Sequence, residues 1–593
     1  MPSPPRWPGH LWHWHGPSDT ATVLDLLVGR PAHLGPAPAA LRVWVTEGPA
    51  RRAALRRQLR ERWPACEVWV GSAYKPLAAQ VAQALLPDWR TRPPRRVHLT
   101  YPVLAGEDPE RFLLESYPLA GWLRDLGAAF TAEARACGGG ADAGYTLEVD
   151  GERFPVSVPL RRAHTLTGGA VWRATGRIWL RTAGGEDWHH DFETVPERAW
   201  DAYAAWLRAQ PWPREAPYFG ALHLRARLPL MQERIGYAHE VLDLGEAFAE
   251  ELYFGTLEFF QARAGEPEGS RTLQPGQIVP LVECVDADTV RLEVGGRPLA
   301  PALPLPPVAA PDLTALDRPP TLAEVAGVLA TLPGAEVRAR SVQGRPVSVV
   351  RRAGRVPGVL VTAGQHANEA TGVVAAVRAA REVATPLDLS VIPLENPDGY
   401  ALFGTLCAQE PGQMHHAARY TALGDDLEYR RSGPPHERAA RAEALARRPA
   451  LHLNLHGYPS HEWTRPLSGY VPRGFAAWTL PKGFLLIFRY QPGTEGQARD
   501  LAQALCAALG EDSELLAFNA RQLAVFGAHS SARPYELLGG VPCVFSERPD
   551  PESPLTVITE FPDETVRGPD FLLGVRAQLR VIEAGVRWAE GKI

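Results

Sequence analysis

A histidine and a glutamate three residues apart are the side chains in this chain best suited to hold a metal ion. His366 and Glu369 follow the apolar run 358–363 and precede a helical pattern over 370–377. Zinc accepts nitrogen and oxygen ligands of this kind, and a catalytic site leaves its fourth position to water. Such a pair alone is common and usually structural. At a junction between a strand and a helix, however, it predicts a Zn²⁺ site.

The third ligand is predicted to be His456. Leucines alternate with polar residues over 451–458, so His452, Asn454 and His456 share one face of a strand. His456 lies at the carboxyl end of that strand, where open α/β sheets place their ligands. His461 is the alternative ligand, and His452 is assigned to the core or to a position behind the ligands.

These motifs resemble the zinc carboxypeptidase family, the carboxypeptidase A-like group. The likeness rests on His366-x-x-Glu369, on the Glu-Asn-Pro-Asp-Gly-Tyr turn at 395–400 and on the strand that ends in His456. The segment 340–346 resembles the opening strand pair of the family. The resemblance covers about residues 319–593, and it implies a zinc-dependent hydrolase of a peptide or peptide-like amide.

The resemblance also implies three catalytic residues. Tyr535 begins a Tyr-x-x-x-Gly-Gly segment whose tyrosine closes over substrate, and Arg419 stands where the family has its oxyanion arginine. Glu560 would be the general base, which takes a proton from the metal-activated water. From the residues alone, Glu560 is a carboxylate at the end of a β-branched strand. Surface positions are the alternatives for Arg419 and Glu560, and Glu547 is a weaker competitor for the base.

The substrate-binding motif departs from the family pattern. The family shows Gly-x-Asp-Leu-Asn-Arg, in which Asn-Arg clamps the terminal carboxylate of the substrate, but Glu428 and Tyr429 fill those two positions here. Arg430, one step further, is the candidate substitute, and the predicted substrate-binding residues are Arg430, Tyr429 and Asn396. A glutamate would repel a substrate carboxylate unless an arginine pairs with it. The choice between exo- and endo-cleavage therefore stays open.

The alternation of strand and helix signals predicts an α/β fold. A mixed, twisted sheet flanked by helices is expected in the C-terminal half, behind an N-terminal α/β plus β-rich region. A capping-box pattern starts a helix near Thr321. The predicted domains are a small α/β region at 1–115, a mixed, β-rich accessory domain at 116–295, a Pro-rich linker at 296–320 and the catalytic domain at 321–593.

Composition narrows the class of protein. The 593 residues are 45% apolar and 22% charged with a net charge of −5, which predicts neither a nucleic-acid nor a membrane partner. Six cysteines without a CxxC pair suggest neither a disulfide framework nor a thiolate zinc site. No signal-peptide pattern and no apolar run of about 20 residues occur, so the cytoplasm is the expected compartment. The oligomeric state is left open.

Three functions are weighed. A zinc-dependent peptide or amide hydrolase of the metallocarboxypeptidase type leads, on the ordered set of His366, Glu369, His456, Tyr535 and Glu560. A zinc-dependent deacylase of N-acyl amino acids, of the aspartoacylase and succinylglutamate desuccinylase type, has a similar ligand pattern. A binding protein on a catalytically degenerate hydrolase fold is the third, because the expected carboxylate clamp is altered. His415 and His416, close before Arg419, could line the cleft, but structural or surface roles are favoured for them.

Overall fold

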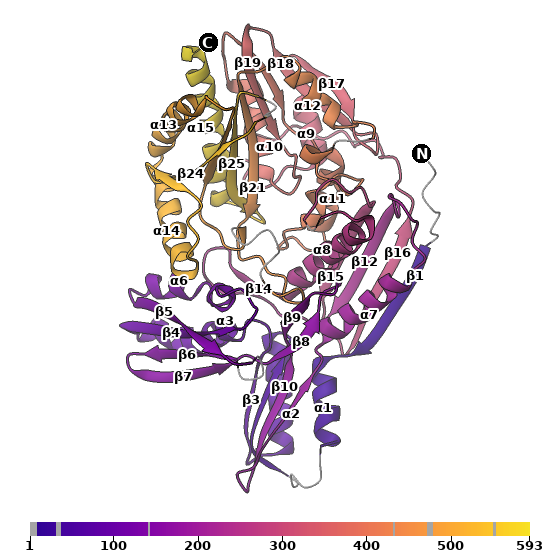
Figure 1. Cartoon of the computed structure of the whole chain (residues 1–593), viewed down its shortest axis with the longest axis vertical. Coiled ribbons are helices and arrows are strands. Elements are labelled where there is room, and N and C mark those ends of the chain that lie inside the picture. The colour runs from indigo at the N-terminus through magenta and orange to yellow at the C-terminus, as the bar shows by residue number, and fades with distance from the viewer. Residues whose placement is uncertain are drawn as a thin grey trace.

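The chain forms two halves, with the C-terminal half packed above the N-terminal half in Figure 1. One long helix of the N-terminal half contacts the loops at one end of the C-terminal sheet, and other segments of the two halves also bond to each other. The computed structural model describes residues 9–30, 37–139, 143–267, 269–430, 433–470, 478–549 and 553–592.

A mixed sheet organises the C-terminal half. In the described residues it has nine strands in the order β17-β18-β20-β19-β21-β25-β22-β24-β23. β20, β19, β21 and β25 run parallel, whereas β22 is antiparallel to β25. This confirms the predicted α/β class with a mixed sheet. The strands are β17 (Ala335–Arg340), β18 (Pro346–Arg352), β19 (Arg355–Ala363), β20 (Leu387–Ile392), β21 (Leu451–Pro459), β22 (Leu485–Tyr490), β23 (Glu536–Leu538), β24 (Val541–Glu547) and β25 (Leu555–Glu564).

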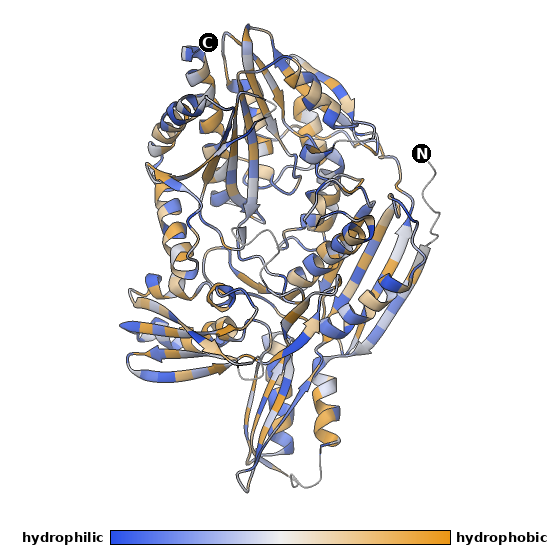
Figure 2. Ribbon diagram, viewed as in Figure 1, coloured by the Kyte–Doolittle hydropathy of each residue, from blue (hydrophilic) through white to orange (hydrophobic). Residues whose placement is uncertain are grey.

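Helices cover both faces of this sheet because successive side chains of a strand point to opposite faces. Val359 and Val361 of β19 belong to the large core with α10, α13 and α15, whereas Leu360 packs with α12 on the other face. Figure 2 shows the corresponding mixture of apolar and polar residues along these elements. The helices are α9 (Leu322–Leu329), α10 (Ala370–Glu382), α11 (Pro397–Cys407), α12 (Arg438–Leu445), α13 (Glu495–Gly510), α14 (Ser513–His529) and α15 (Pro569–Lys592).

The N-terminal half contains three four-stranded sheets in its described part. All three join strands from both sides of the boundary expected at residues 115/116: β1 pairs with β16, β2 pairs with β10, and β4 pairs with β5 and β6. Strand patterns in sequence do not specify their partners, so the two expected regions share sheets. The strands are β1 (Gly9–Pro17), β16 (Thr289–Arg297), β12 (Ala221–Leu228), β15 (Gln277–Cys284); β11 (Asp187–Phe192), β10 (Gly176–Thr182), β2 (Pro38–Val45), β3 (Glu67–Ser72); β5 (Ala129–Cys137), β4 (Arg96–Leu104), β6 (Gly144–Val149) and β7 (Glu152–Ser157).

Helix α8 (Leu244–Ala264) connects the two halves. Most of its 21 residues are buried, and four of the buried ones are glutamate or glutamine side chains that bond to other parts of the chain. Beyond β16, residues 298–321 form neither helix nor strand, and α9 then begins at the predicted capping box, where Thr321 Oγ1 accepts from Glu324 N at 3.2 Å.

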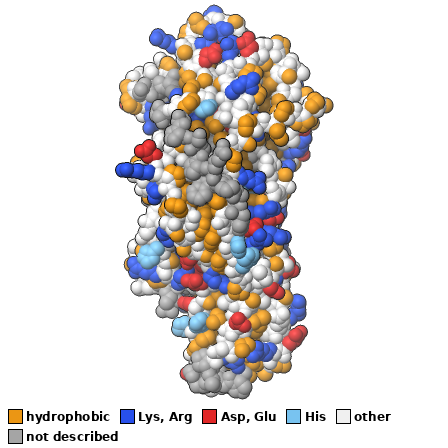
Figure 3. Space-filling model, turned by 90° about the vertical axis from the view of Figure 1, so that its right-hand side faces the viewer, with side chains coloured by type: hydrophobic (Ala, Val, Ile, Leu, Met, Phe, Trp, Pro, Cys, Tyr) orange, Lys and Arg blue, Asp and Glu red, His pale blue; other side chains and the backbone are white. Residues whose placement is uncertain are grey.

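Surface and helix properties agree with a globular chain. On the face drawn in Figure 3, acidic and basic side chains are interspersed. Among the described residues, no helix is both long and apolar enough to cross a bilayer.

Candidate metal centre

His366 and Glu369 lie in the loop between β19 and α10, as the sequence predicts. The chain turns at Gly364, whose φ of +63° favours glycine and where a Cβ would come within 2.7 Å of Leu394. Glu369 is the N-cap residue of α10. β21 runs parallel to β19, so His456 comes to the same end of the sheet. β21 continues to Pro459, so His456 lies three residues before the carboxyl end of the strand and not at the end itself.

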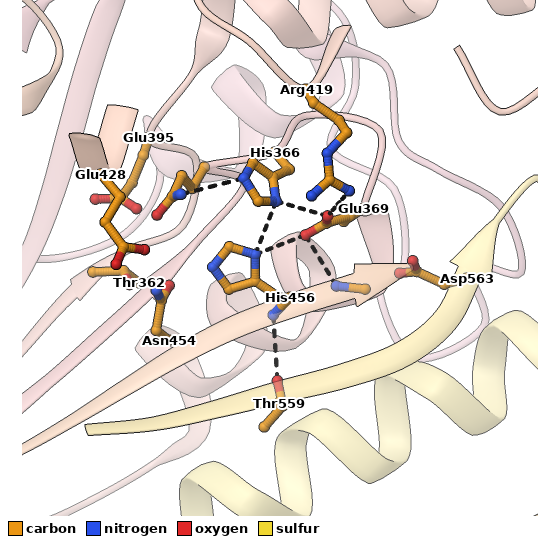
Figure 4. A network of polar contacts seen from close by, with 12 residues as sticks. Thr362, His366, Glu369, Glu395, Arg419, Glu428, Asn454, His456, Thr559 and Asp563 are labelled. Carbon is orange, nitrogen blue, oxygen red and sulfur yellow. Dashed lines mark hydrogen bonds and ion pairs between the residues drawn. The ribbon is translucent and has the colours of Figure 1, made fainter. Parts of the chain in front are cut away.

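Three ligand atoms converge at this end of the sheet (Figure 4). His366 Nδ1 lies 2.8 Å from Glu369 Oε1, and His456 Nδ1 lies 2.9 Å from Glu369 Oε2. The two Nδ1 atoms are 3.1 Å apart. All three side chains are buried, and one ligand atom from each lies within 4.8 Å of the others. Two imidazole nitrogens and one carboxylate oxygen form a donor set that fits zinc.

Asp426 orients the ring of His366 from the side opposite to the other two candidate ligands. Its Nε2 faces Asp426 Oδ2 at 3.4 Å, and Asp426 Oδ1 accepts from Gln365 Nε2 at 3.0 Å. Burial alone would raise the pKa of Asp426, but the hydrogen bond with His366 outweighs it and holds that pKa below its ordinary value. A carboxylate on the second ring nitrogen fixes the orientation of a ligating histidine. Nδ1 of His366 is thereby directed at the metal position.

Arg419 lies beside the ligands. Its Nη1 donates to Glu369 Oε1 at 2.8 Å and to Glu564 Oε1 at 3.2 Å. Its side chain is 15% exposed and lines a cavity next to the metal group. The guanidinium is therefore positioned to donate to a group bound in that cavity.

Glu560 stands next to His456 across the sheet. The two residues are register partners on β25 and β21, and Glu560 lines the same cavity. Burial and the nearby Glu369 carboxylate raise the pKa of Glu560 well above its ordinary value. The competing Glu547 is exposed at the end of β24 and is not among the described residues that line the cavity.

The cavity has a volume of about 230 Å³. This is smaller than the roughly 300–1,000 Å³ of pockets that hold drug-sized ligands, so it suits a small substrate or the end of a larger one. Two of its lining residues, Phe254 and Arg271, come from the N-terminal half. The lining residues are Phe254, Arg271, Gln365, His366, His416, Arg419, Glu428, Tyr429, His456, Gly457, Tyr458, Pro459, Trp463, Trp478, Ile487, Arg489, Ile558 and Glu560.

Three residues predicted for the site are not among these lining residues. Tyr535 is half-buried and packs against the core of the N-terminal half. The Asn396 side chain caps α11 and donates to the carbonyl of Tyr420 at 3.1 Å, so it holds two loops together. Arg430 is buried in an ion pair with Asp425 at 2.7 Å. The sequence patterns predicted these residues for the site, but the side chains of Asn396 and Arg430 bond to other parts of the protein and that of Tyr535 packs against a hydrophobic core.

Tyr429 does line the cavity, together with residues that sequence reasoning missed. Glu428 Oε1 accepts from Arg489 Nη1 of β22 at 2.6 Å. Arg271, from the segment that follows α8, lies over the Tyr429 ring at 5.5 Å. Alternation along 485–490 could have placed Arg489 on a strand face. No local pattern, however, predicts that Arg489 contacts Glu428 or that Arg271 contacts Tyr429.

His416 also lines the cavity, the position that the sequence left open beside the favoured structural or surface role. Its Nδ1 lies 2.9 Å from Glu250 of α8, and its Nε2 lies 3.1 Å from Glu564. Burial alone would lower the pKa of His416, but these two carboxylates raise it to about 10. His416 is therefore a cation at neutral pH that joins the two halves of the chain.

His461, the alternative ligand, bonds to α8 instead of to the metal group. Its Nε2 lies 2.8 Å from Glu246 Oε1, and Glu240 and Asp243 are also close enough to act on its charge. Burial alone would lower the pKa of His461, but Glu246 raises it to about 9. The imidazolium thus forms a buried contact between the halves.

This contact predicts a pH-dependent stability. The folded pKa of about 9 lies above the unfolded value of roughly 6.5, so the stabilisation is complete below about pH 6.5 and is lost as the pH rises to about 9. Between these pH values we expect wild type to lose up to about 3 kcal/mol more free energy of unfolding than His461→Gln. Urea denaturation at both pH values measures this. Equal losses in the two proteins would contradict the assignment.

Comparison with known proteins finds a family model that matches part of the chain. Residues 335–429 match the model of the zinc carboxypeptidase family. The match lies within the range of the predicted resemblance and confirms it for this segment, which includes His366, Glu369 and Arg419. No curated protein matches the chain.

Solved metallocarboxypeptidases align with about half of this chain at low sequence identity. The metallo-carboxypeptidase from Burkholderia cenocepacia is 15% identical over 52% of this chain and 74% of that chain, with a TM-score of 0.29. The metallo-carboxypeptidase from Pseudomonas aeruginosa, solved with (2-guanidinoethylmercapto)succinic acid, is 15% identical over 52% and 73%, with a TM-score of 0.28. Carboxypeptidase A from Helicoverpa armigera is 14% identical over 46% and 71%, with a TM-score of 0.27.

Proposed function

We propose that this chain, whose residues 335–429 match the zinc carboxypeptidase family, is a zinc-dependent hydrolase of a peptide or peptide-like amide. One observation carries the proposal: His366, Glu369 and His456 direct three ligand atoms at one point beside a cavity that Glu560 and Arg419 line. A metal group, a carboxylate with a raised pKa and a guanidinium are the parts that amide hydrolysis by water requires.

Each side chain has a separate task in this reaction. A Zn²⁺ ion held by His366, Glu369 and His456 would lower the pKa of a water molecule and polarise the substrate carbonyl. Glu560 accepts a proton from the attacking water and later delivers it to the nitrogen of the leaving amine. Arg419 donates to the oxygen that becomes negative, for which it exchanges its present contact with Glu369.

A deacylase of N-acyl amino acids is the second candidate, and the small cavity of about 230 Å³ supports it. Both reactions break an amide bond with the same groups, so substrate size distinguishes them. Turnover of acylated dipeptides favours the peptidase, and turnover of N-acyl amino acids alone favours the deacylase. The cytoplasm stays the predicted compartment.

Metal binding tests the site directly. We expect purified wild type to bind about one Zn²⁺ per chain and His366→Ala to lose most of it, because removal of one of three protein ligands leaves an incomplete set. Metal content after dialysis against zinc, read by atomic emission, measures this. His189→Ala is the matched control, since His189 is exposed on β11 in the other half. Full occupancy in His366→Ala would contradict the ligand assignment.

A further inference from the structure

We propose that Arg489 and Arg271 together bind a carboxylate on the residue that the reaction releases, in place of the Asn-Arg clamp that the sequence lacks. The inference rests on the proposed function, because it assigns the substrate-binding part of the same cavity. It also gives the N-terminal half a direct task, since Arg271 precedes the linker.

Each altered clamp position contacts an arginine from elsewhere in the chain. Glu428, in the asparagine position, pairs with Arg489 Nη1 at 2.6 Å. Tyr429, in the arginine position, has the Arg271 guanidinium over its ring at 5.5 Å. A guanidinium over an aromatic face is held in place while its edges can still donate. Two positively charged groups thus stand beside the positions where the family motif has its clamp.

Arg489 has donor capacity that Glu428 does not use. Its Nε is buried and has no hydrogen-bond partner among the described residues, although the side chain as a whole is 26% exposed. A buried donor without an acceptor raises the free energy of the folded protein, and a hydrogen bond to a ligand oxygen removes that penalty. Glu428 keeps the guanidinium in position by one Nη atom.

The strand register places Arg489 on the correct side of the sheet. Ile487 pairs with Ile558, two residues from the row of Glu560, and Arg489 pairs with Thr556, four residues from it. Ile487, Ile558 and Arg489 line the cavity with Glu560, so they share its face. Four residues of strand correspond to about 13 Å between Cα atoms, and the long arginine side chain covers part of that span. The apolar side chains of Ile487 and Ile558 lie between Glu560 and Arg489, and this arrangement suits one substrate residue that carries a charged group at its far end.

Arg271 is anchored at the opposite wall. The backbone N–H of Asp426 donates to the carbonyl of Arg271 at 3.0 Å, and Arg271 Nη1 lies 3.5 Å from Asp426 Oδ2. Asp426 is the residue that orients His366, so the position of Arg271 is tied to that of the metal group. The N-terminal half thereby completes the cavity.

The charge of the cavity suits an anion. Apart from the metal ligands and the internally paired His416, the described lining residues with full charges are three arginines and two glutamates, namely Arg271, Arg419, Arg489, Glu428 and Glu560. A carboxylate in this small, partly buried cavity would gain charge-assisted hydrogen bonds.

Kinetics on three matched substrates test the proposal with the zinc-loaded full chain. The substrates are acyl-Phe-Ala, which has a terminal carboxylate, acyl-Phe-Ala-amide, which has none, and acyl-Phe-Glu-amide, which has a side-chain carboxylate. We expect wild type to cleave one of the two acids with a kcat/KM about 10²-fold or more above that for acyl-Phe-Ala-amide. Whichever acid is preferred identifies the carboxylate that is bound.

The arginine variants show which residues cause the preference. Arg489→Met should bring the ratio of acid to amide within a few-fold of one, mainly through KM, and Arg489→Lys should retain part of it. Arg271→Met should lower the ratio about tenfold. Arg587→Met, an exposed position on α15, is the control and should leave it unchanged. Equal cleavage of acids and amide by wild type, or an unchanged ratio in Arg489→Met, overturns the proposal.

A binding experiment separates this inference from the proposed function. Calorimetry with the zinc-loaded Glu560→Gln protein measures the affinity for the same intact substrates without turnover. Tighter binding of an acid than of the amide, lost when Arg489→Met is added, supports the carboxylate site even if wild type hydrolyses none of them. Turnover by wild type with no preference in either assay sinks the carboxylate site and leaves the hydrolase proposal in place.

Discussion

Glu560→Gln should lower kcat for amide hydrolysis by about 10²–10⁴-fold, the range that a positioned general base contributes. Glutamine keeps the shape of the side chain but cannot accept the proton of the attacking water. Glu560 is register partner of His456 and is not one of the three converging ligands, so the zinc content should stay at the wild-type level. Steady-state kinetics and metal analysis on the same preparation give both results.

The control for this variant is Glu547→Gln. Glu547 is the last residue of β24 and is exposed, so its replacement should leave kcat unchanged. If Glu560→Gln kept more than about a tenth of wild-type activity with full zinc occupancy, Glu560 would not be the general base. Loss of activity together with loss of zinc would instead make Glu560 part of the metal site.

Glu251→Ala should destabilise the protein by about 3–5 kcal/mol, the cost of removing one partner of a buried ion pair. Glu251 of α8 is fully buried, and its Oε1 accepts from the backbone N–H groups of Leu467 and Ser468 at 2.7 Å each. Its Oε2 accepts from Ser468 Oγ at 2.5 Å and lies 3.2 Å from Arg465 Nη2. Alanine would leave these donors buried without that acceptor.

Urea denaturation followed by tryptophan fluorescence measures this effect, with Glu61→Ala as control. Glu61 is exposed near the end of α2 (Pro49–Arg62), so its removal should change the free energy of unfolding by less than about 0.5 kcal/mol. The segment that Glu251 holds also carries Trp463 into the cavity wall. A variant as stable as wild type would show that the contact between α8 and this segment contributes little.

The metal group could be located from sequence because each of its members follows from a local pattern. His366 and Glu369 stand between an apolar strand and a helix, and His456 stands near the carboxyl end of an alternating strand. Parallel strands bring their carboxyl ends to one edge of a sheet, so these residues had to lie close together if the strands were neighbours. Glu560 follows by the same reasoning, since β25 is parallel to β21.

The substrate end of the cavity could not be located in this way. Arg430 and Asn396 were predicted to contact substrate, but Asp425 and the carbonyl of Tyr420 bind their side chains. Tyr535 lies in a recognisable segment, yet it packs on the core of the N-terminal half, whose position no local pattern specifies. The same reason explains why three sheets join strands across residue 115.

The sequence by itself determined which side chains could supply metal-binding chemistry, because strand ends, a helix start and the side chains on them are local features. Only the tertiary structure decided what surrounds that chemistry. Arg271 and Arg489 are 218 residues apart by their sequence numbers, yet both line one cavity with Glu428 and Tyr429. Such contacts depend on the packing of α8 and its following segment against the sheet edge, and packing of distant segments leaves no periodic signal in the chain.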